Sequence, residues 1–592
     1  MPGPGDRGGK KEKPKNAKGT LLRVLGYVKQ YRMIVIFLCV LALISNAGNL
    51  LGPKFAGHAI SEAAAGQGKV NFSRVLYYAK WMLIVYVGSN LLSFAVSLCM
   101  MRVSRRIAQR LRNDVFDKLM LLPVGYFDRN QAGDIISRVS YDIDVINTSL
   151  STDIVQIMTS SVTVVGSFLL MCSISLPLVG CMLVTIPIAI WYTKYMGKRT
   201  RPLYSRRSAA YGRMNGFVEE MFSGQKTILA YAYEDGVCEQ FNEINHRAAD
   251  AYYEADRLGV TMGPTIGFVN NLGLALIGFV GALLYSGGYV NLGSISSFVL
   301  YSRKFSGPIN EIANIINEIY SALSAAERVF RLLDEPEEVK DIYNALTLSG
   351  VQGNVEMEHV SFGYVPGRKI LKDLNLRADA GKTIAIVGAT GAGKTTIINL
   401  LMRFYDPDAG QIYVDGSEIR SVTRDSLRRS YAMVLQDTWL FRGTIFENIA
   451  YGKKNATMDE VVAAAKAARI HNYIMRLPEG YRTVISEDGG NISKGQKQLL
   501  TIARAMLYDT SMLILDEATS NVDTNTEREV QKAMRSLMKG KTCFVIAHRL
   551  STIQNADCIL VVEHGDVMEQ GTHEELMRQK GRYYRLYASQ FE

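Results

Sequence analysis

The chain has 592 residues, of which 48% are hydrophobic, and a formal net charge of +11. A single hydrophobic core stops growing well below this length, so a one-domain protein is excluded and two or more domains are expected. The excess positive charge lies largely in the N-terminal tail and beside apolar runs, which favours a membrane surface and argues against nucleic acid as a partner. The seven cysteines form no C-x-x-C pair, so neither a zinc site nor a disulfide framework is predicted.

The first part of the chain reads as a membrane domain behind a disordered tail. Residues 1–20 are rich in glycine, proline and lysine, and the long apolar run behind them does not resemble a cleavable signal. A sixth apolar segment begins near residue 294 and continues, with mixed polar and apolar residues, to 333. The region 21–333 is therefore predicted to be an all-α transmembrane domain of six helices. The other five segments, nearly free of charge and each long enough to span a bilayer, are 33–51, 81–101, 154–176, 177–195 and 262–285.

The two long connections between these segments are themselves helical in pattern. Residues 102–122 and 200–261 show the apolar periodicity of helices with few breakers, so we expect the membrane helices to continue far into the cytosol. Short turns near 123–134 and 219–224 would join these cytosolic extensions. Both connections are rich in lysine and arginine, which predicts that they and both termini lie on the cytoplasmic side of the plasma membrane.

Two charges stand inside the sixth helix. A charge within a membrane helix is costly and usually faces water or a partner, so Arg303 and Lys304 need an explanation. One interpretation is that they line a substrate pathway. The other is that they reach the membrane surface or pair with an acid such as Glu311.

After a linker at 334–353, strands alternate with helical segments over 354–592, which predicts an α/β domain. Near its start, the strand-like run 382–387 leads into a glycine-rich turn and then a helix. Such a turn presents backbone N–H groups to a phosphate, and only residues without Cβ let the backbone wrap an anion closely. Lys394 is expected to reach the β- and γ-phosphates of ATP, and Thr395 to ligate Mg²⁺. The predicted ATP-binding residues of this P-loop are Gly388, Thr390, Gly391, Ala392, Gly393, Lys394, Thr395 and Thr396.

Further candidate residues follow other strands of this domain. Asp516 and Glu517 end an apolar strand, where the first suits a hold on Mg²⁺ and the second a general base that polarises water. Gln436 also ends a strand and is predicted to reach the metal or the attacking water. His548 follows a further strand and is expected near the γ-phosphate, while Tyr364 is an exposed aromatic suited to stack on adenine.

A second anion site is predicted at the start of another helix. Ser493, Gly495 and Gln496 stand at a helix N-terminus, where N–H groups and the helix dipole favour negative charge. One nucleotide does not need two such sites from the same fold. The simplest interpretation is that this helix serves a nucleotide bound to another copy of the domain.

With these motifs in this order, the chain from about residue 20 onward resembles an ABC (ATP-binding cassette) exporter half-transporter. The resemblance rests on Tyr364, the P-loop, Gln436, the 492–496 signature, Asp516 with Glu517, the 520–523 loop and His548. It implies two subunits with two ATP molecules sandwiched between cassettes, with Asp523 among the nucleotide-binding residues. It also implies that the turns near 123–134 and 215–228 are coupling helices that press on the cassettes.

One departure from the family pattern concerns the second subunit. The preferred signature is L-S-G-G-Q, whereas this chain has Ile492, Ser493, Lys494, Gly495 and Gln496. In this family a complete hydrolytic set beside an altered signature often marks one half of a heterodimer. The chain also resembles bacterial multidrug half-exporters, and a heterodimer is favoured over a homodimer.

The function expected from the sequence is ATP-driven export of amphipathic small molecules across the plasma membrane. A lipid exporter and a peptide exporter of the same architecture remain alternatives. An ATP-gated channel or regulatory subunit is a different class, and Glu517 argues against it because gating needs binding more than turnover. Asparagines in the membrane helices predict a cavity of mixed polarity: Asn46, Asn49, Asn90, Asn270, Asn271, Asn314 and Asn317.

Overall fold

The computed structural model describes residues 14, 16–64, 66, 69–435, 438–486, 492–516, 524–547 and 553–591. The chain divides into two compact units. The first comprises Met1–Leu122 and Asn130–Pro336, and the second comprises Pro123–Arg129 and Glu337–Glu592. A short stretch from the N-terminal half therefore belongs to the second unit. This stretch contains helix α4 (Val124–Arg129).

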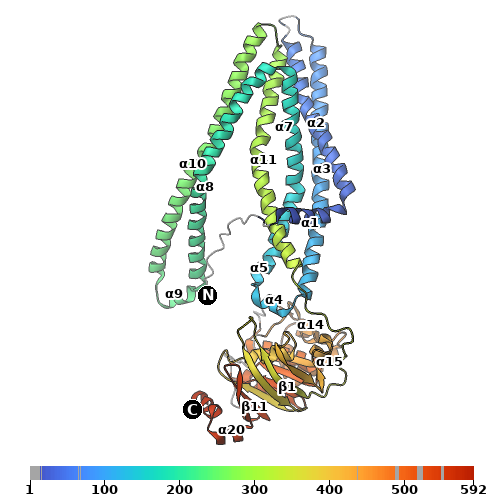
Figure 1. Ribbon diagram of the computed structural model, residues 1–592, viewed down its shortest axis with the longest axis vertical. Coiled ribbons are helices and arrows are strands. Elements are labelled where there is room, and N and C mark those ends of the chain that lie inside the picture. Colours follow the sequence, from blue (N-terminus) through green and yellow to red (C-terminus); the bar gives the residue numbers. More distant parts are fainter. Residues whose placement is uncertain are drawn as a thin grey trace. The chain divides into compact units, whose positions relative to one another are not determined.

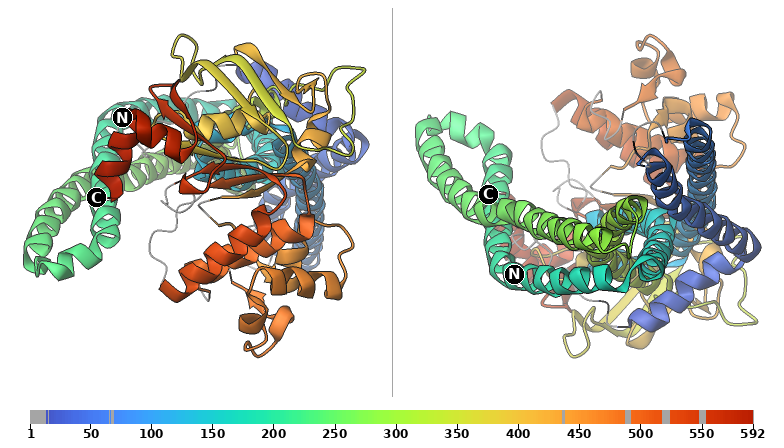
Figure 2. Two further views of the ribbon diagram at one scale, coloured as in Figure 1. Left: turned by 90° about the horizontal axis from the view of Figure 1, so that it is seen from below. Right: turned by 90° about the horizontal axis from the view of Figure 1, so that it is seen from above.

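The first unit consists of helices, and its long ones run side by side (Figures 1 and 2). Helices α8 and α10 form an antiparallel pair joined by the short α9, while α2, α3, α7 and α11 pack together. The predicted helical extensions are confirmed, because α3, α8 and α10 each run without a break well beyond the apolar segments. The bounds are α1 Ala17–Lys29, α2 Arg32–Ala63, α3 Phe72–Leu121, α5 Ala132–Ser137, η1 Arg138–Asp142, α6 Ile143–Thr148, η2 Ser149–Asp153, α7 Ile154–Ile174, α8 Leu176–Ser223, α9 Gln225–Ala230, α10 Glu234–Ser286 and α11 Leu292–Leu333.

Five helical stretches among the described residues are long and apolar enough to cross a membrane: Arg32–Ala63, Phe72–Leu121, Ala132–Ile174, Leu176–Ser223 and Glu234–Ser286. They contain four of the five apolar segments predicted from the sequence, and the fifth, predicted at 154–176, ends two residues earlier, at Ile174. The predicted sixth segment forms the 42-residue helix α11. Three of its polar side chains, those of Ser297, Tyr301 and Lys304, donate hydrogen bonds to backbone carbonyls of α2.

Lys304 of α11 binds the backbone of α2 beside a proline. Its ammonium donates to the carbonyl of Asn49 at 2.7 Å. That carbonyl lies four residues before Pro53, which has no N–H to donate to it within α2. Glu311, the acid considered as a partner, instead accepts a hydrogen bond from Gln156 at 3.1 Å. The polarity of Lys304 thus replaces a helix hydrogen bond that the proline removes.

The second unit is an α/β domain with a six-stranded sheet in the order β12-β11-β3-β10-β9-β6. The five strands from β11 to β6 are parallel, and β12 is antiparallel at the edge. A second, antiparallel sheet has the order β2-β1-β4-β5, and β7 pairs with β8. The strands are β1 Val355–Phe362, β2 Leu371–Ala378, β3 Thr383–Val387, β4 Ala409–Val414, β5 Ser417–Glu418, β6 Tyr431–Val434, β7 Gly443–Thr444, β8 Val484–Ile485, β9 Met512–Asp516, β10 Thr542–Ile546, β11 Cys558–Glu563 and β12 Asp566–Gly571.

Alternate residues of the central strands enter two separate hydrophobic cores. On β3, Ala385 and Val387 face one core while Ile384 and Ile386 face the other. Parallel strands covered on both faces are expected to be apolar throughout, as these are. The helices are α12 Lys394–Leu401, α13 Arg424–Arg429, α14 Ile445–Ala450, α15 Met458–Ala467, α16 His471–Ile474, η3 Gly480–Arg482, α17 Lys494–Tyr508, α18 Thr524–Met538, α20 His573–Gln579 and α21 Arg582–Phe591.

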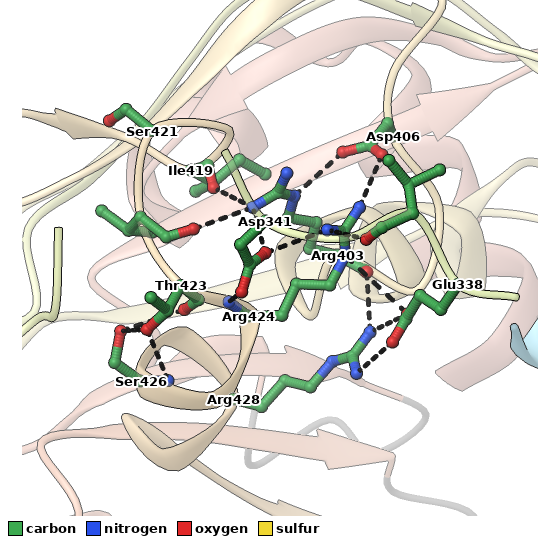
Figure 3. A network of polar contacts seen from close by, with 12 residues as sticks. Glu338, Asp341, Arg403, Asp406, Ile419, Ser421, Thr423, Arg424, Ser426 and Arg428 are labelled. Atoms are coloured by element: carbon green, nitrogen blue, oxygen red, sulfur yellow. Dashed lines mark hydrogen bonds and ion pairs between the residues drawn. The ribbon is translucent and has the colours of Figure 1, made fainter. Parts of the chain in front are cut away.

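The linker predicted at 334–353 is bound to the α/β domain along most of its length. Figure 3 shows three arginines that hold it: Arg403, Arg424 and Arg428. Arg424 donates to Asp341 and to Asp406, each at 3.0 Å, and Arg428 donates to Glu338 at 3.1 Å. Farther on, a parallel bridge joins Leu346 to Val422. The linker is therefore an ordered part of the second unit from residue 337 onward.

Candidate nucleotide-binding site

The predicted P-loop connects the end of β3 to the start of α12. Gly388 has φ +154, and a Cβ there would come within 2.1 Å of the carbonyl oxygen of Val562 on β11. Gly393 has φ +111 and caps α12. Larger side chains would be strained at Gly393 and would collide with β11 at Gly388. The backbone can therefore curl closely in front of the helix N-terminus, as phosphate binding requires.

Lys394 begins α12 and its side chain turns back over this loop. The ammonium donates to the carbonyls of Gly388 at 2.8 Å and Ala389 at 2.9 Å. Burial lowers the pKa of Lys394, and the negative charge of Asp516 at the end of β9 opposes that shift. Because it bonds to these two carbonyls, the ammonium lies beside the P-loop, where a phosphate would bind. Thr390, Gly391 and Thr395 are exposed around it.

The residues present suit a bound magnesium nucleotide. Thr395 places an exposed hydroxyl one residue after Lys394, and the carboxylate of Asp516 is near enough to act on that lysine. Within the described ranges, no group of three or more His, Cys, Asp or Glu side chains is placed to hold a metal. A hydroxyl and one carboxylate leave the other positions of an octahedral Mg²⁺ to water and phosphate oxygens, as is usual for this ion.

Tyr364 lies at the side of the P-loop helix. Its hydroxyl hydrogen-bonds with Thr396 Oγ1 at 3.3 Å and accepts from Asn399 Nδ2 at 3.0 Å. Tyr364 is 42% exposed, so part of it is accessible to a ligand. The structure therefore brings Tyr364, Thr396 and Lys394 together on and beside α12.

The signature residues form the first turn of α17. Ser493 Oγ accepts from the backbone N–H of Gln496 at 3.3 Å, and Gln496 Oε1 accepts from the N–H of Ser493 at 3.0 Å. This reciprocal capping box leaves the remaining N–H groups of the turn free to bind an anion. Ser493 and Lys494 are exposed, while Gly495 is buried. The turn thus has the geometry of an anion site.

Four predicted residues lie outside the described part of the chain: Gln436, Glu517, Asp523 and His548. Their roles remain predictions.

Comparison with known proteins identifies the architecture. A model of the ABC transporter transmembrane region matches residues 35–309, and a model of the ABC transporter domain matches residues 371–520. An uncharacterized ABC transporter ATP-binding protein, YfiC of Bacillus subtilis, is 42% identical over 583 residues, covering 98% of this chain and 96% of that protein. The chain belongs to the ABC exporters.

Two further similarities refine this assignment. A fatty acid ABC transporter ATP-binding/permease protein of Mycobacterium bovis is 44% identical over 521 residues, covering 88% of this chain and 82% of its own. The solved structure of a bacterial Atm1-family ABC exporter with ATP bound matches with a TM-score of 0.73 and 29% identity, covering 95% of this chain and 99% of that one. The fold class is thereby confirmed as a helical transmembrane domain followed by a nucleotide-binding domain.

Membership has direct consequences for this ABC exporter. It is a membrane protein with a cytoplasmic ATP-binding domain, and it couples ATP hydrolysis to transport as a dimer in the bilayer. Because the second unit is that cytoplasmic domain, α4 is a cytoplasmic helix packed on it.

Sequence reasoning missed the residues around α4. Tyr405 and Asp128 are hydrogen-bonded, although they lie 277 positions apart in the chain. Nothing in a single sequence pairs residues at that separation. The turn predicted at 123–134, which the family resemblance expected to press on the cassette, was the available signal, but it did not identify the residues that pair.

Proposed function

We propose that this exporter moves amphipathic small molecules, among them acyl-chain lipids, out of the cytosolic leaflet of the plasma membrane. The observation that carries the proposal is the P-loop of Lys394 on a chain whose other unit is built of long apolar helices. The fatty acid transporter and an ATP-dependent lipid A-core flippase of Methylobacillus flagellatus, 34% identical over 580 residues and covering 97% of both chains, support a lipid-like cargo. A multidrug exporter and a peptide exporter are alternatives of the same architecture.

The proposed division of labour in the ATP site rests on the described side chains of the P-loop and, for Gln436, Glu517, Asp523 and His548, on their sequence motifs alone. Tyr364 stacks on adenine, the N–H groups of residues 388–394 bind the phosphates, and Lys394 leaves its carbonyl partners to neutralise the terminal ones. Thr395, Asp516 and Gln436 would hold Mg²⁺, and the ion would offset phosphate charge. Glu517 takes the proton of the attacking water, His548 contacts the γ-phosphate, and Asp523 completes the nucleotide contacts.

Glu517→Gln separates binding from hydrolysis. Removing the general base is expected to lower the ATPase rate about 10²- to 10⁴-fold while ATP stays bound, because the binding groups are unchanged. ATP turnover by full-length protein in nanodiscs, together with retention of labelled ATP, measures both. Turnover near the wild-type rate would show that Glu517 is not the base.

The second half of each ATP site is proposed to come from Ser493, Gly495 and Gln496 of another subunit. The exposed first turn of α17 supports this, since an anion site needs an open approach. The sequence-based preference for a heterodimer rests on Lys494, and the comparisons do not support it over a homodimer. Chain expressed alone decides the matter, because a homodimeric exporter purifies as an active dimer while a heterodimeric half gains its ATPase only with its partner.

The cargo can be tested with proteoliposomes. The proposal expects ATPase activity to rise when fatty acids or phospholipid analogues are added, and labelled analogues to change leaflet only with ATP. Stimulation by peptides and not by lipids would favour the peptide alternative.

The domain boundaries remain part of the proposal: a basic tail at 1–20, the transmembrane domain at 21–333, the linker at 334–353 and the cassette at 354–592. The order seen from residue 337 onward supports treating the linker as a structural extension of the cassette.

A further inference from the structure

The loop that follows the P-loop helix, residues 402–408, receives contacts from several elements of the second unit. We refer to it as the junction loop. Arg403 and Asp406 belong to the arginine network that holds the linker, with Arg403 Nε donating to Asp406 at 3.0 Å. Asp408 accepts the backbone N–H of Gly363 at 2.9 Å, directly before Tyr364. The junction loop therefore borders the proposed adenine platform.

Tyr405 of the junction loop touches that platform with its ring. Its ring centroid lies 5.0 Å from that of Tyr364, with an interplanar angle of 85°, and 5.5 Å from that of Phe362. Edge-to-face pairs at this distance prefer one relative orientation, because the ring edge is positive and the face negative. The position of the Tyr405 ring therefore constrains that of Tyr364.

The other end of Tyr405 touches α4. Its hydroxyl donates to Asp128 Oδ2 at 2.5 Å. A Cβ on Gly125 would come within 2.9 Å of the ring, so the α4 backbone lies directly against it. Burial, and after it the hydrogen bond to Asp128, raises the pKa of Tyr405, so the phenol keeps its proton at neutral pH and remains a donor.

The junction loop itself is firmly held. Arg403, 5% exposed, donates to the carbonyl of Ile419 at 2.7 Å and of Val422 at 3.0 Å (Figure 3). Arg428 donates to the carbonyls of Met402 at 3.2 Å and Arg403 at 3.0 Å. Because the backbone on either side of Tyr405 is fixed, a displacement of α4 acts on the Tyr405 side chain before it moves the loop.

We propose that Tyr405 is a positioning residue that couples the adenine-stacking ring of Tyr364 to Asp128 and Gly125 on α4. This inference rests on the proposed role of Tyr364 in binding adenine. α4 follows α3 (Phe72–Leu121) in the chain after Leu122 and Pro123, and it belongs to the second unit. By thermodynamic reciprocity, the hydrogen bond at α4 alters affinity for the base, and the bound base alters the placement of α4.

The test is nucleotide preference, which a general loss of stability does not change. Equilibrium binding of labelled ATP and UTP to the full-length protein in nanodiscs gives the ratio of the two affinities. Tyr405→Phe keeps the ring and removes the hydroxyl, and Asp128→Asn removes the charge that holds it. Each is expected to lower the ATP:UTP ratio about threefold, the scale of one hydrogen bond. Because both act through one contact, the double variant is expected to equal the singles.

Three further variants decide between outcomes. Gly125→Ala pushes on the ring from α4 and is expected to lower the same ratio. Tyr413→Phe removes a hydroxyl that donates to Gln411 at 2.7 Å in an exposed hydrogen bond on β4, and this variant is expected to leave the ratio unchanged. Tyr364→Ala is expected to give the largest drop. If Tyr364→Ala has no effect, the proposed adenine site is wrong. If it lowers the ratio while Tyr405→Phe and Asp128→Asn do not, or if their effects add, the coupling is refuted and the adenine site stands.

Discussion

Buried polar groups are held in different ways where the linker meets the cassette and where α11 meets α2 in the helical unit. In the cassette, charges are buried in pairs: Arg424 is 7% exposed and binds Asp341 and Asp406. In the helical unit, polar side chains of α11 donate to backbone carbonyls of α2, as Tyr301 does to Leu50 and Ser297 to Pro53. Removing a cassette arginine leaves carboxylates without their partner, whereas removing a helix donor leaves only a neutral carbonyl. The same kind of substitution should therefore be far more damaging in the cassette.

Lys394→Ala gives the largest expected effect and tests whether the cassette depends on this one charge. Loss of an ammonium aimed at the terminal phosphates is expected to lower the ATPase rate by roughly 10²–10³. Lys382→Ala is the matched control, since Lys382 lies beside the same strand but is exposed and paired with Asp557. ATPase assays in nanodiscs measure both variants. Comparable losses of ATPase activity in the two variants would mean that any positive charge near β3 supports hydrolysis, and that the position of Lys394 in the P-loop is not decisive.

Arg424→Ala tests the stability side of the comparison. Breaking a buried ion pair costs about 3–5 kcal/mol, and the partly exposed acids place this case near the lower end. The unfolding transition of the cassette, followed by calorimetry on the full-length protein, is expected to fall by roughly 6–12 °C.

Its control is Arg429→Ala on the same helix. Arg429 is exposed and pairs with Asp425 one turn away, so its loss should cost less than about 0.5 kcal/mol. Similar shifts for both arginines would remove the distinction between buried and exposed pairs in the cassette.

The P-loop side of the site was predictable because its chemistry is local. A tight turn between β3 and α12 needs glycine at residues 388 and 393, and the lysine that serves it comes next in the chain. The capping box of Ser493 and Gln496 is likewise written within four residues. The arginine network and the contact of Tyr405 with Asp128 join positions far apart in the chain. The spacing of residues in the sequence therefore does not predict these contacts.

The membrane helices show where local patterns mislead. The segment 262–285 contains five glycines, a composition that suits close helix packing. A Cβ at Gly273 would meet Thr185 and one at Gly281 would meet Ile295, both within 3.2 Å, but Gly263, Gly267 and Gly278 have nothing within 4 Å. The apolar composition therefore predicts the helix. It does not predict which of its glycines pack closely, because that depends on residues of other helices.

Lys304→Met gives the smallest expected effect and tests the helical side of the comparison. Methionine keeps much of the apolar length and removes the donor to Asn49, and hydrogen bonds between membrane helices average about 0.6 kcal/mol. Unfolding in mixed detergent is expected to show a loss of about 1 kcal/mol, since Pro53 leaves this carbonyl without a helix partner. Arg303→Met, at an exposed neighbouring position, is the control and should change stability less.

Pro53→Ala shows whether the proline is the reason that Lys304 matters. Alanine restores an N–H four residues after Asn49, so that carbonyl regains a partner within α2. The cost of Lys304→Met should then fall toward zero in the Pro53→Ala background, giving a coupling between positions that belong to different helices. An undiminished cost would mean that Lys304 stabilises the unit through its other neighbour, the ring of Tyr86, whose centroid lies 5.5 Å from the ammonium. In that case the charge of Lys304 would contribute to the stability of the helical unit, as the charge of Arg424 does in the cassette, and the two units would differ less in how buried polar groups stabilise them.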